Sequence, residues 1–245
     1  MLEDLKPHIE ELRTRLIRII AALFIGFFAC FSFWEPILNW IAQPLYSALA
    51  EGSEVIAYKM GEQFITAVIV SFFAALLATL PYIFWQIWAF IAPGLYANEK
   101  ALAIPFVLGT TIMFLLGAAF AYYVVFPYGF TYLVNFGEGS VTAMISIGEY
   151  LSFFLKLIFG FGVSFELPVV CFFLAKIGLI DDKSLTGFFR YAVILIFIFS
   201  AILTPPDVLT QFLMSIPLII LYGLSILLVR AVNPAAKEDN EEAAA

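Results

Sequence analysis

Long uninterrupted apolar stretches constrain this chain more than any other feature of its sequence. A helix needs about 20 predominantly apolar residues to cross a hydrocarbon core of roughly 30 Å. Stretches close to that length recur along nearly all of the 245 residues. We therefore predict an all-α polytopic membrane protein with six transmembrane helices in a single integral membrane domain, followed by a tail at 231–245. The predicted spans lie at about 16–33, 64–91, 101–126, 150–177, 191–203 and 208–229.

The composition agrees with this class of protein. Hydrophobic residues make up 63% of the chain and charged residues only 13%, whereas about a quarter of the residues of an ordinary soluble domain are charged. The first sixteen residues are charged and amphipathic, and no small-residue cleavage site follows the first apolar run. We therefore expect no cleavable signal peptide. No soluble domain of useful size can be separated from the apolar runs.

The same sequence argues against several classes of function. Its one histidine and two cysteines form no Cys/His cluster, so we predict no metal site and no cofactor. A net charge of -7 argues against nucleic acid as a partner, because nucleic-acid binding requires a basic surface. No set of nucleophile, base and orienting group suggests a catalytic triad, and Walker, Rossmann and zinc-hydrolase motifs are absent. We therefore expect a protein that is not an enzyme.

Basic residues predict the orientation in the membrane, because loops rich in Lys and Arg stay in the cytoplasm. With the N-terminus inside, ten of the twelve basic residues fall in cytoplasmic segments, Lys59 falls in an outer loop, and Lys156 lies within the fourth run. We therefore expect a multi-pass protein of the cytoplasmic (inner) membrane with both termini in the cytoplasm.

Prolines and charged residues predict where the runs end. The first run ends at "WEP", and residues 34–62 then alternate short apolar pieces with acidic residues, which we interpret as a packed cap at the membrane surface. The third run is expected to close at "FPYG", residues 126–129. The fifth run has thirteen residues, which cover only about 20 Å as a helix. We therefore predict a short fifth span.

Glu166 is an acidic residue in the middle of the fourth apolar run. Its ionised form would cost several kcal/mol there unless it faces water, a partner or the interior of the bundle. Lys156, on the same predicted helix, is ten residues earlier, about 15 Å along the axis, and cannot pair with it directly. Glu166 is therefore either protonated or exposed to a wet concavity, which the nearby Pro168 would help to open. We interpret it as a functional or architectural residue, and the alternative is a neutral packing residue.

Acidic and basic residues alternate in "HIEELRTRL", just before the first run. In the simplest interpretation, Glu10 and Glu11 form local charge pairs with Arg13 and Arg15 at the start of a solvated helix. The alternative is that one of these carboxylates belongs to a binding surface. Sequence spacing alone leaves both interpretations open.

A second acidic residue lies on the same predicted cytoplasmic face. Glu99, in "PGLYANEKAL", is either an ordinary acidic residue in the first turn of the third span or part of the same surface as Glu11. The aromatic residues Phe90 and Tyr96 are close to it in the sequence. Two separated carboxylates would suit a basic ligand, because carboxylates accept paired hydrogen bonds from a guanidinium group.

Six short segments stand at the ends of the predicted spans. They are "HIEELRTRL", "AQPL", "QIWAFIAPGLYANEK", "AFAYYVVFP", "FGVSFELPV" and "LTPPDVLTQ". Together and in this order they resemble the TatC family, the component of the twin-arginine protein translocase that binds folded precursors with an Arg-Arg signal peptide. The resemblance covers almost the whole chain. It implies a glove-like concave helix bundle with short fifth and sixth spans, which assembles partner subunits for export driven by the proton motive force.

The resemblance implies roles for residues of the cytoplasmic face and of the outer cap. Glu11 and Glu99 would form the signal-peptide site, each accepting one arginine of the pair. Arg13 and Phe90 would support that surface. Pro44, in "AQPL", would shape the outer cap.

The resemblance also implies partners within the membrane. Glu166 matches the family's intramembrane acid in a water-accessible concave face. Asp207 and Gln211 match positions associated with docking of the single-span subunits TatA and TatB. Self-association in the receptor complex is also implied, whereas Lys156 has no counterpart that we call typical of the family.

Two other classes of function stay open at this point. A small proton-coupled transporter would use Glu166 as its protonatable site, although the facing spans offer only scattered hydroxyl groups such as those of Ser71, Thr110 and Ser164. A purely structural membrane scaffold would tolerate replacement of Glu166 by Gln or Leu.

Overall fold

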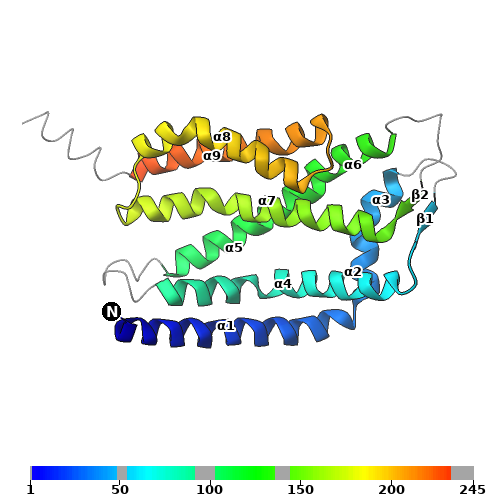
Figure 1. The fold of residues 1–245 in the computed structure, drawn as a ribbon, viewed down its shortest axis with the longest axis horizontal. Helices are drawn as coiled ribbons and strands as arrows, with labels where there is room; N and C mark the ends of the chain where they lie inside the picture. The colour runs from blue at the N-terminus through cyan, green and yellow to red at the C-terminus, as the bar shows by residue number, and fades with distance from the viewer. Residues whose placement is uncertain (1, 49–53, 92–102, 136–143, 233–245) are drawn as a thin grey trace, which may run out of the picture. The chain divides into compact units, whose positions relative to one another are not determined.

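The chain folds into helices that are long enough to cross a membrane. The computed structural model describes residues 2–48, 54–91, 103–135 and 144–232 (Figure 1). Over these residues, six helical stretches are long and apolar enough to span a bilayer. The predicted all-helical class with six membrane-length helices is therefore confirmed. The six stretches are His8–Phe31, Glu62–Ile91, Ala103–Val134, Ile147–Lys176, Asp182–Leu203 and Val208–Val232.

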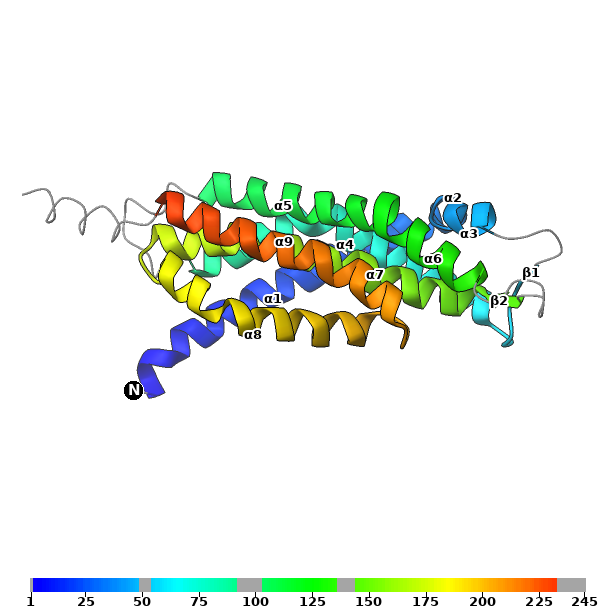
Figure 2. The same cartoon turned by 90° about the horizontal axis from the view of Figure 1, so that it is seen from above.

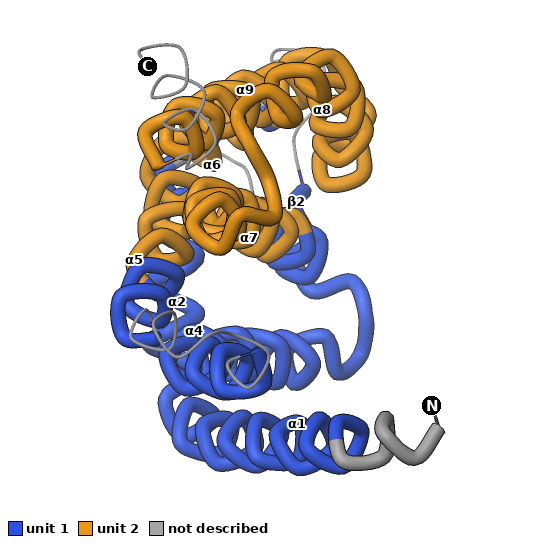
Figure 3. Tube along the Cα trace, turned by 90° about the vertical axis from the view of Figure 1, so that its left-hand side faces the viewer, with its two compact units in different colours: residues 1–111, 134–152 blue, residues 112–133, 153–245 orange. Residues whose placement is uncertain are grey.

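The described residues form two compact units, which Figure 3 shows in blue and orange: those within 1–111 and 134–152, and those within 112–133 and 153–245. The first unit contains α1, α4 and the short elements between them, and most of the remaining helices belong to the second. The elements in chain order are α1 (Leu2–Phe31), α2 (Trp34–Ile41), α3 (Gln43–Ala48), β1 (Glu54–Ile56), α4 (Glu62–Ile91), α5 (Ala103–Phe120), η3 (Ala121–Val125), α6 (Phe126–Asn135), β2 (Met144–Ser146), α7 (Ile147–Lys176), α8 (Asp182–Leu203) and α9 (Val208–Val232).

In the first unit, α1 lies beside α4 along much of its length (Figure 1). Gly26 permits a close approach of the two helices, because a Cβ at that position would lie 3.3 Å from the Cβ of Ala75 and 3.4 Å from the Cγ2 of Thr79. Large apolar side chains on the other faces of α1, among them Phe24 and Phe28, are exposed. Such a surface suits contact with lipid, which is the solvent expected around an apolar helix of this length.

A pair of three-residue strands, which the sequence analysis did not predict, joins two distant parts of the first unit. β1 and β2 run parallel, with Val55 opposite Ile145. Glu62, at the start of α4, ties the pair to the first residues of α7: its Oε1 accepts hydrogen bonds from the Ser146 hydroxyl at 2.6 Å and from the Gly148 amide at 3.0 Å. Glycine suits position 148 because a Cβ there would lie 2.6 Å from that oxygen.

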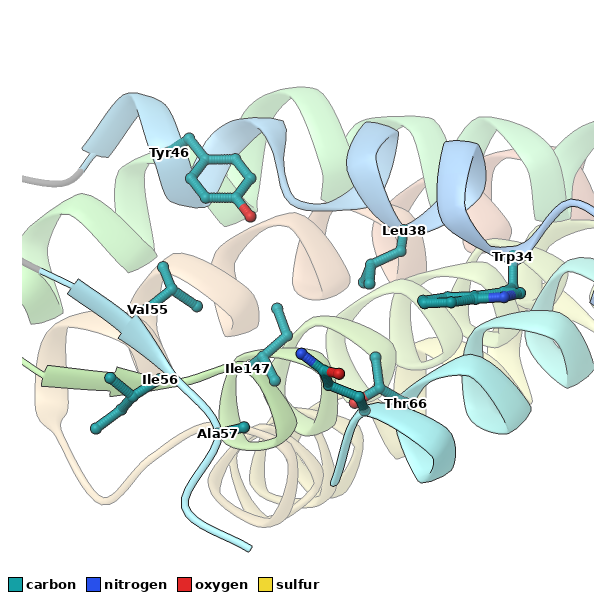
Figure 4. Close-up of a pocket in the computed structure, with 9 residues that line it drawn as sticks. Trp34, Leu38, Tyr46, Val55, Ile56, Ala57, Thr66 and Ile147 are labelled. Carbon is teal, nitrogen blue, oxygen red and sulfur yellow. The ribbon is translucent and has the colours of Figure 1, made fainter. Parts of the chain in front are cut away.

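The segment predicted as a packed cap forms the short helices α2 and α3. Ile41 and Leu45 are fully buried, and the carbonyl of Ile41 accepts a hydrogen bond from the Tyr150 hydroxyl at 2.7 Å. A cavity of about 260 Å³ lies beside the two helices (Figure 4). Its lining comes from α2, α3, β1 and the segment after it, and the first residues of α4 and α7: Trp34, Leu38, Tyr46, Val55, Ile56, Ala57, Gln63, Thr66 and Ile147.

The third predicted span continues past its expected end at "FPYG", which corrects that prediction. One π-helical turn, η3, follows α5 directly, and the Phe126 amide donates to the carbonyl of Ala121, five residues earlier. Pro127 is the second residue of the α6 helix that follows. A π turn shifts the hydrogen-bond register by one residue, and the first turn of a new α register accommodates a residue without an amide proton. The helix therefore extends to Asn135.

Glycines allow α5 and α7 to pack closely in the second unit. A Cβ at Gly117 would lie 2.6 Å from the carbonyl oxygen of Phe161, and a Cβ at Gly162 would lie 2.6 Å from the ring of Phe114. Aromatic rings fill the neighbouring space, with the rings of Phe126 and Phe154 in edge contact at 5.3 Å between centroids. These contacts build a tightly packed interior around the middle of α7.

α8 and α9 form an antiparallel hairpin, which can be followed in Figure 2. α8 begins at Asp182 and is capped by the carboxylate of Asp181, which accepts a hydrogen bond from the Ser184 amide at 2.6 Å. α8 has 22 residues and α9 has 25, against 30 in each of α4 and α7. The fifth helix is therefore longer than the thirteen residues predicted, which corrects that boundary. A capped polar stretch extends α8 before its apolar run begins.

Candidate functional site

Glu11 lies near the start of α1 and is paired with an arginine of its own helix. Arg15, one turn further on, donates to Oε1 of Glu11 from Nε at 3.0 Å and also from Nη2. The side chains of Arg15 and Glu11 are 19% and 29% exposed, so the pair is partly shielded from solvent. A helix brings residues four apart onto one face. The local charge pair that the sequence predicted is therefore present, and Arg15 forms it.

Gln86 of α4 connects this pair to the neighbouring helix. Its Oε1 accepts a hydrogen bond from Nη1 of Arg15 at 3.3 Å, and the residue is only 5% exposed. Sequence reasoning did not identify Gln86. The available signal was a lone amide within the apolar stretch "FWQIWAF", because a buried polar side chain requires a partner.

Phe90 and Arg13 belong to the same two helices, α4 and α1. Phe90 follows Gln86 by one turn of α4, which places both on one face of that helix, and its ring is partly exposed. Arg13 is exposed, and its side chain makes no hydrogen bond or ion pair within the part of the chain that the structure describes. Glu99 and Tyr96, which the sequence placed at this surface, lie outside the described residues.

Glu166 lies within α7, two residues before Pro168. Both of its carboxylate oxygens are buried and have no hydrogen-bond partner among the described residues. Lys156, on the same helix, is exposed and lies about 15 Å away along the axis, too far to form an ion pair. A buried carboxylate without a partner is costly in its ionised form.

Asp207 and Gln211 both take part in the α8–α9 hairpin. Asp207 precedes α9, and its Oδ1 accepts a hydrogen bond from the Thr210 amide at 2.7 Å, while the Thr210 hydroxyl contacts Oδ2. The Nε2 of Gln211 donates to the carbonyl of Phe197 on α8 at 3.1 Å. Each side chain therefore has a structural role in the hairpin. Gln211 also lines a shallow apolar groove together with residues of α8 such as Ile194.

Pro44 is the second residue of α3 and is half-buried. A proline is well tolerated there, because the first turn of a helix needs no intrahelical partner for its amide. Its carbonyl accepts a hydrogen bond from the Ser47 hydroxyl at 3.0 Å.

Metal ligands do not gather in the part of the chain that the structure describes. Over those residues, no group of three or more His, Cys, Asp or Glu side chains could hold a metal ion. The candidate site is built from carboxylate, guanidinium and amide groups of α1 and α4.

Known proteins resemble this chain over almost its whole length. Residues 7–217 match the family described as the Sec-independent protein translocase protein TatC. The Helicobacter pylori protein of that name is 51% identical over 241 residues, which cover 98% of this chain and 92% of the relative. The Campylobacter jejuni protein is 50% identical over 244 residues, covering 99% of this chain and 100% of the relative.

A solved structure has the same fold as this chain. The crystal structure of a twin arginine translocase receptor, TatC, superposes with a TM-score of 0.81 at 38% identity, covering 91% of this chain and 97% of that chain. The family resemblance inferred from the six sequence segments is therefore confirmed. The chain belongs to the TatC family of Sec-independent protein translocase proteins, which makes it a multi-pass membrane protein of that export system.

Proposed function

We propose that this chain is the receptor subunit of a twin-arginine translocase, which exports folded precursor proteins and is not itself an enzyme. Membership of the TatC family and the likeness to a solved twin arginine translocase receptor support this function. In this proposal the protein binds the Arg-Arg signal peptide of a precursor and then assembles partner subunits for export driven by the proton motive force.

The observation that carries the proposal is the guanidinium group held by Glu11. Within the chain itself, Glu11 accepts two N–H groups from Arg15. Its carboxylate therefore already binds a guanidinium group in this structure, which is the chemistry that an Arg-Arg ligand requires. Arginine presents a planar fork of donors, whereas lysine presents a point charge. Glu99 is the proposed acceptor for the second arginine of the ligand, and Phe90 and Arg13 are the proposed supporting residues.

The proposed orientation places this surface in the cytoplasm. Ten of the twelve basic residues fall on the side of the N-terminus when the six spans alternate, and loops rich in Lys and Arg stay inside. Both termini would then be cytoplasmic. A cytoplasmic position of Glu11 suits a receptor for precursors that are synthesised in that compartment.

Partner docking is proposed for a second set of residues. Glu166, whose carboxylate oxygens have no hydrogen-bond partner among the described residues, would contact a polar group of an inserted helix. Gln211 and Asp207, at the α8–α9 hairpin, would contact single-span subunits of the TatA and TatB type, and self-association of the receptor is proposed as well. The exposed apolar groove beside Gln211 supports docking of a helix there.

Binding of a synthetic Arg-Arg signal peptide tests the receptor function. The full chain in detergent would be titrated against the fluorescent peptide, with fluorescence anisotropy as the measurement. Removing both carboxylates, in a Glu11→Ala, Glu99→Ala double variant, should weaken binding by about tenfold to a hundredfold, as expected for loss of charge-assisted hydrogen bonds. Unchanged affinity in the double variant would overturn the proposed site.

A further inference from the structure

The hydrogen bonds of Arg15 are distributed unevenly over the Glu11 carboxylate. Nε and Nη2 of Arg15 both donate to Oε1 of Glu11, and Nη1 donates to Gln86 on α4. No described residue donates a hydrogen bond to Oε2. Among these residues, one oxygen of the proposed acceptor is therefore hydrogen-bonded and the other is not.

Gln86 gives this arrangement a fixed support. Its side chain is buried, so its amide oxygen is held by the packing of α4 and does not move freely in solvent. A guanidinium bound at once to Glu11 and Gln86 bridges two helices of the first unit. This bridge restricts Glu11 to fewer side-chain rotamers. A surface glutamate without such a bridge would lose more conformational entropy when a ligand binds to it.

We propose that Arg15 and Gln86 are positioning residues of the signal-peptide site, which hold Glu11 so that its Oε2 faces the ligand. The inference rests on the proposed function, because it assumes that Glu11 accepts an arginine of the peptide. Ordering the carboxylate before the ligand arrives removes a cost of binding. Arg15 can hold Glu11 and Gln86 at the same time because its guanidinium group has donors on separate nitrogens.

Charge-conserving variants separate positioning from a simple effect of charge. Arg15→Lys keeps the positive charge and a favourable charge pair with Glu11, but its donors all lie on one nitrogen, so it cannot reproduce the contacts that Arg15 makes from three separate nitrogens. Gln86→Met removes the acceptor with little change of volume or charge. Each variant should weaken binding of the Arg-Arg peptide by about threefold to tenfold, the range expected for immobilising one flexible side chain.

The pair of variants provides an internal check. Because both remove the same bridge, the Arg15→Lys, Gln86→Met double variant should bind about as well as whichever single variant binds more weakly. Arg18→Lys is the matched control, because Arg18 is an exposed arginine about one turn further along α1; it should leave the affinity unchanged. Thermal unfolding of each variant in detergent would show that the fold is retained.

Two outcomes would overturn the inference. Unchanged binding in both single variants would mean that the bridge does not position Glu11. Tighter binding would mean that Arg15 competes with the ligand for the carboxylate. Glu11→Gln separates these failures from failure of the proposed site: if Glu11→Gln weakens binding and Arg15→Lys does not, only the positioning role is lost. If Glu11→Gln also leaves binding unchanged, the site itself is wrong.

Discussion

Replacing Gly117 by alanine should destabilise the second unit, because the two helices that meet there leave no room for a methyl group. The added Cβ would lie 2.6 Å from the carbonyl oxygen of Phe161 and 2.9 Å from the side chain of Phe165. A backbone oxygen cannot rotate away, so α5 and α7 must separate. Overpacking of this kind costs about 3 kcal/mol, offset by about 1 kcal/mol of gained helix propensity.

Gly223→Ala is the matched control, because Gly223 lies within α9 and a Cβ there would meet no atom within 4 Å. A net loss of about 2 kcal/mol lowers the midpoint of thermal unfolding by about 4–8 °C for a chain of this size, whereas the control should raise it by about 2–4 °C. Circular dichroism in detergent measures both. Equal midpoints for the two variants would refute the close helix contact at Gly117.

Two further changes test local contacts. Tyr150→Phe removes the hydrogen bond to the buried Ile41 carbonyl and should cost about 1–2 kcal/mol in thermal unfolding, whereas the exposed Tyr123→Phe should change little. The hydrogen bonds from Ser184 hold the pKa of Asp181 below its ordinary value. The stability that this cap contributes is therefore complete above the ordinary Asp pKa of about 4, and it is lost as the pH falls through the lower pKa of the folded state. A titration of stability with pH should therefore show a smaller acid-dependent loss in Asp181→Asn than in the parent chain, and an unchanged profile would contradict the cap.

The helices were the predictable part of this fold. Apolar runs of membrane length depend only on local composition, and each of the six predicted runs overlaps a helix of that length. The ends of the helices were harder to predict, because they depend on hydrogen-bond register and capping. The π turn before Pro127 carries the third helix past "FPYG", and the cap at Asp181 starts α8 before its apolar run.

The candidate site was predictable only where chemistry followed from spacing. A charge pair between residues four apart on α1 could be expected from "HIEELRTRL", and Arg15 forms it with Glu11. Gln86 could not be placed beside Arg15, because 71 residues separate them in the chain. The same holds for Glu62, whose carboxylate meets Ser146 across 84 residues.

Receptor function is tested most directly by comparing two adjacent carboxylates. Arg-Arg and Lys-Lys forms of one signal peptide would be titrated against the parent chain, Glu11→Gln and Glu10→Gln. Glu10 is the matched control because it is exposed and carries the same charge one residue away. We predict that Glu11→Gln weakens binding of the Arg-Arg peptide and reduces its advantage over the Lys-Lys peptide, while Glu10→Gln preserves both. Equal effects of the two variants would contradict recognition of arginine by Glu11.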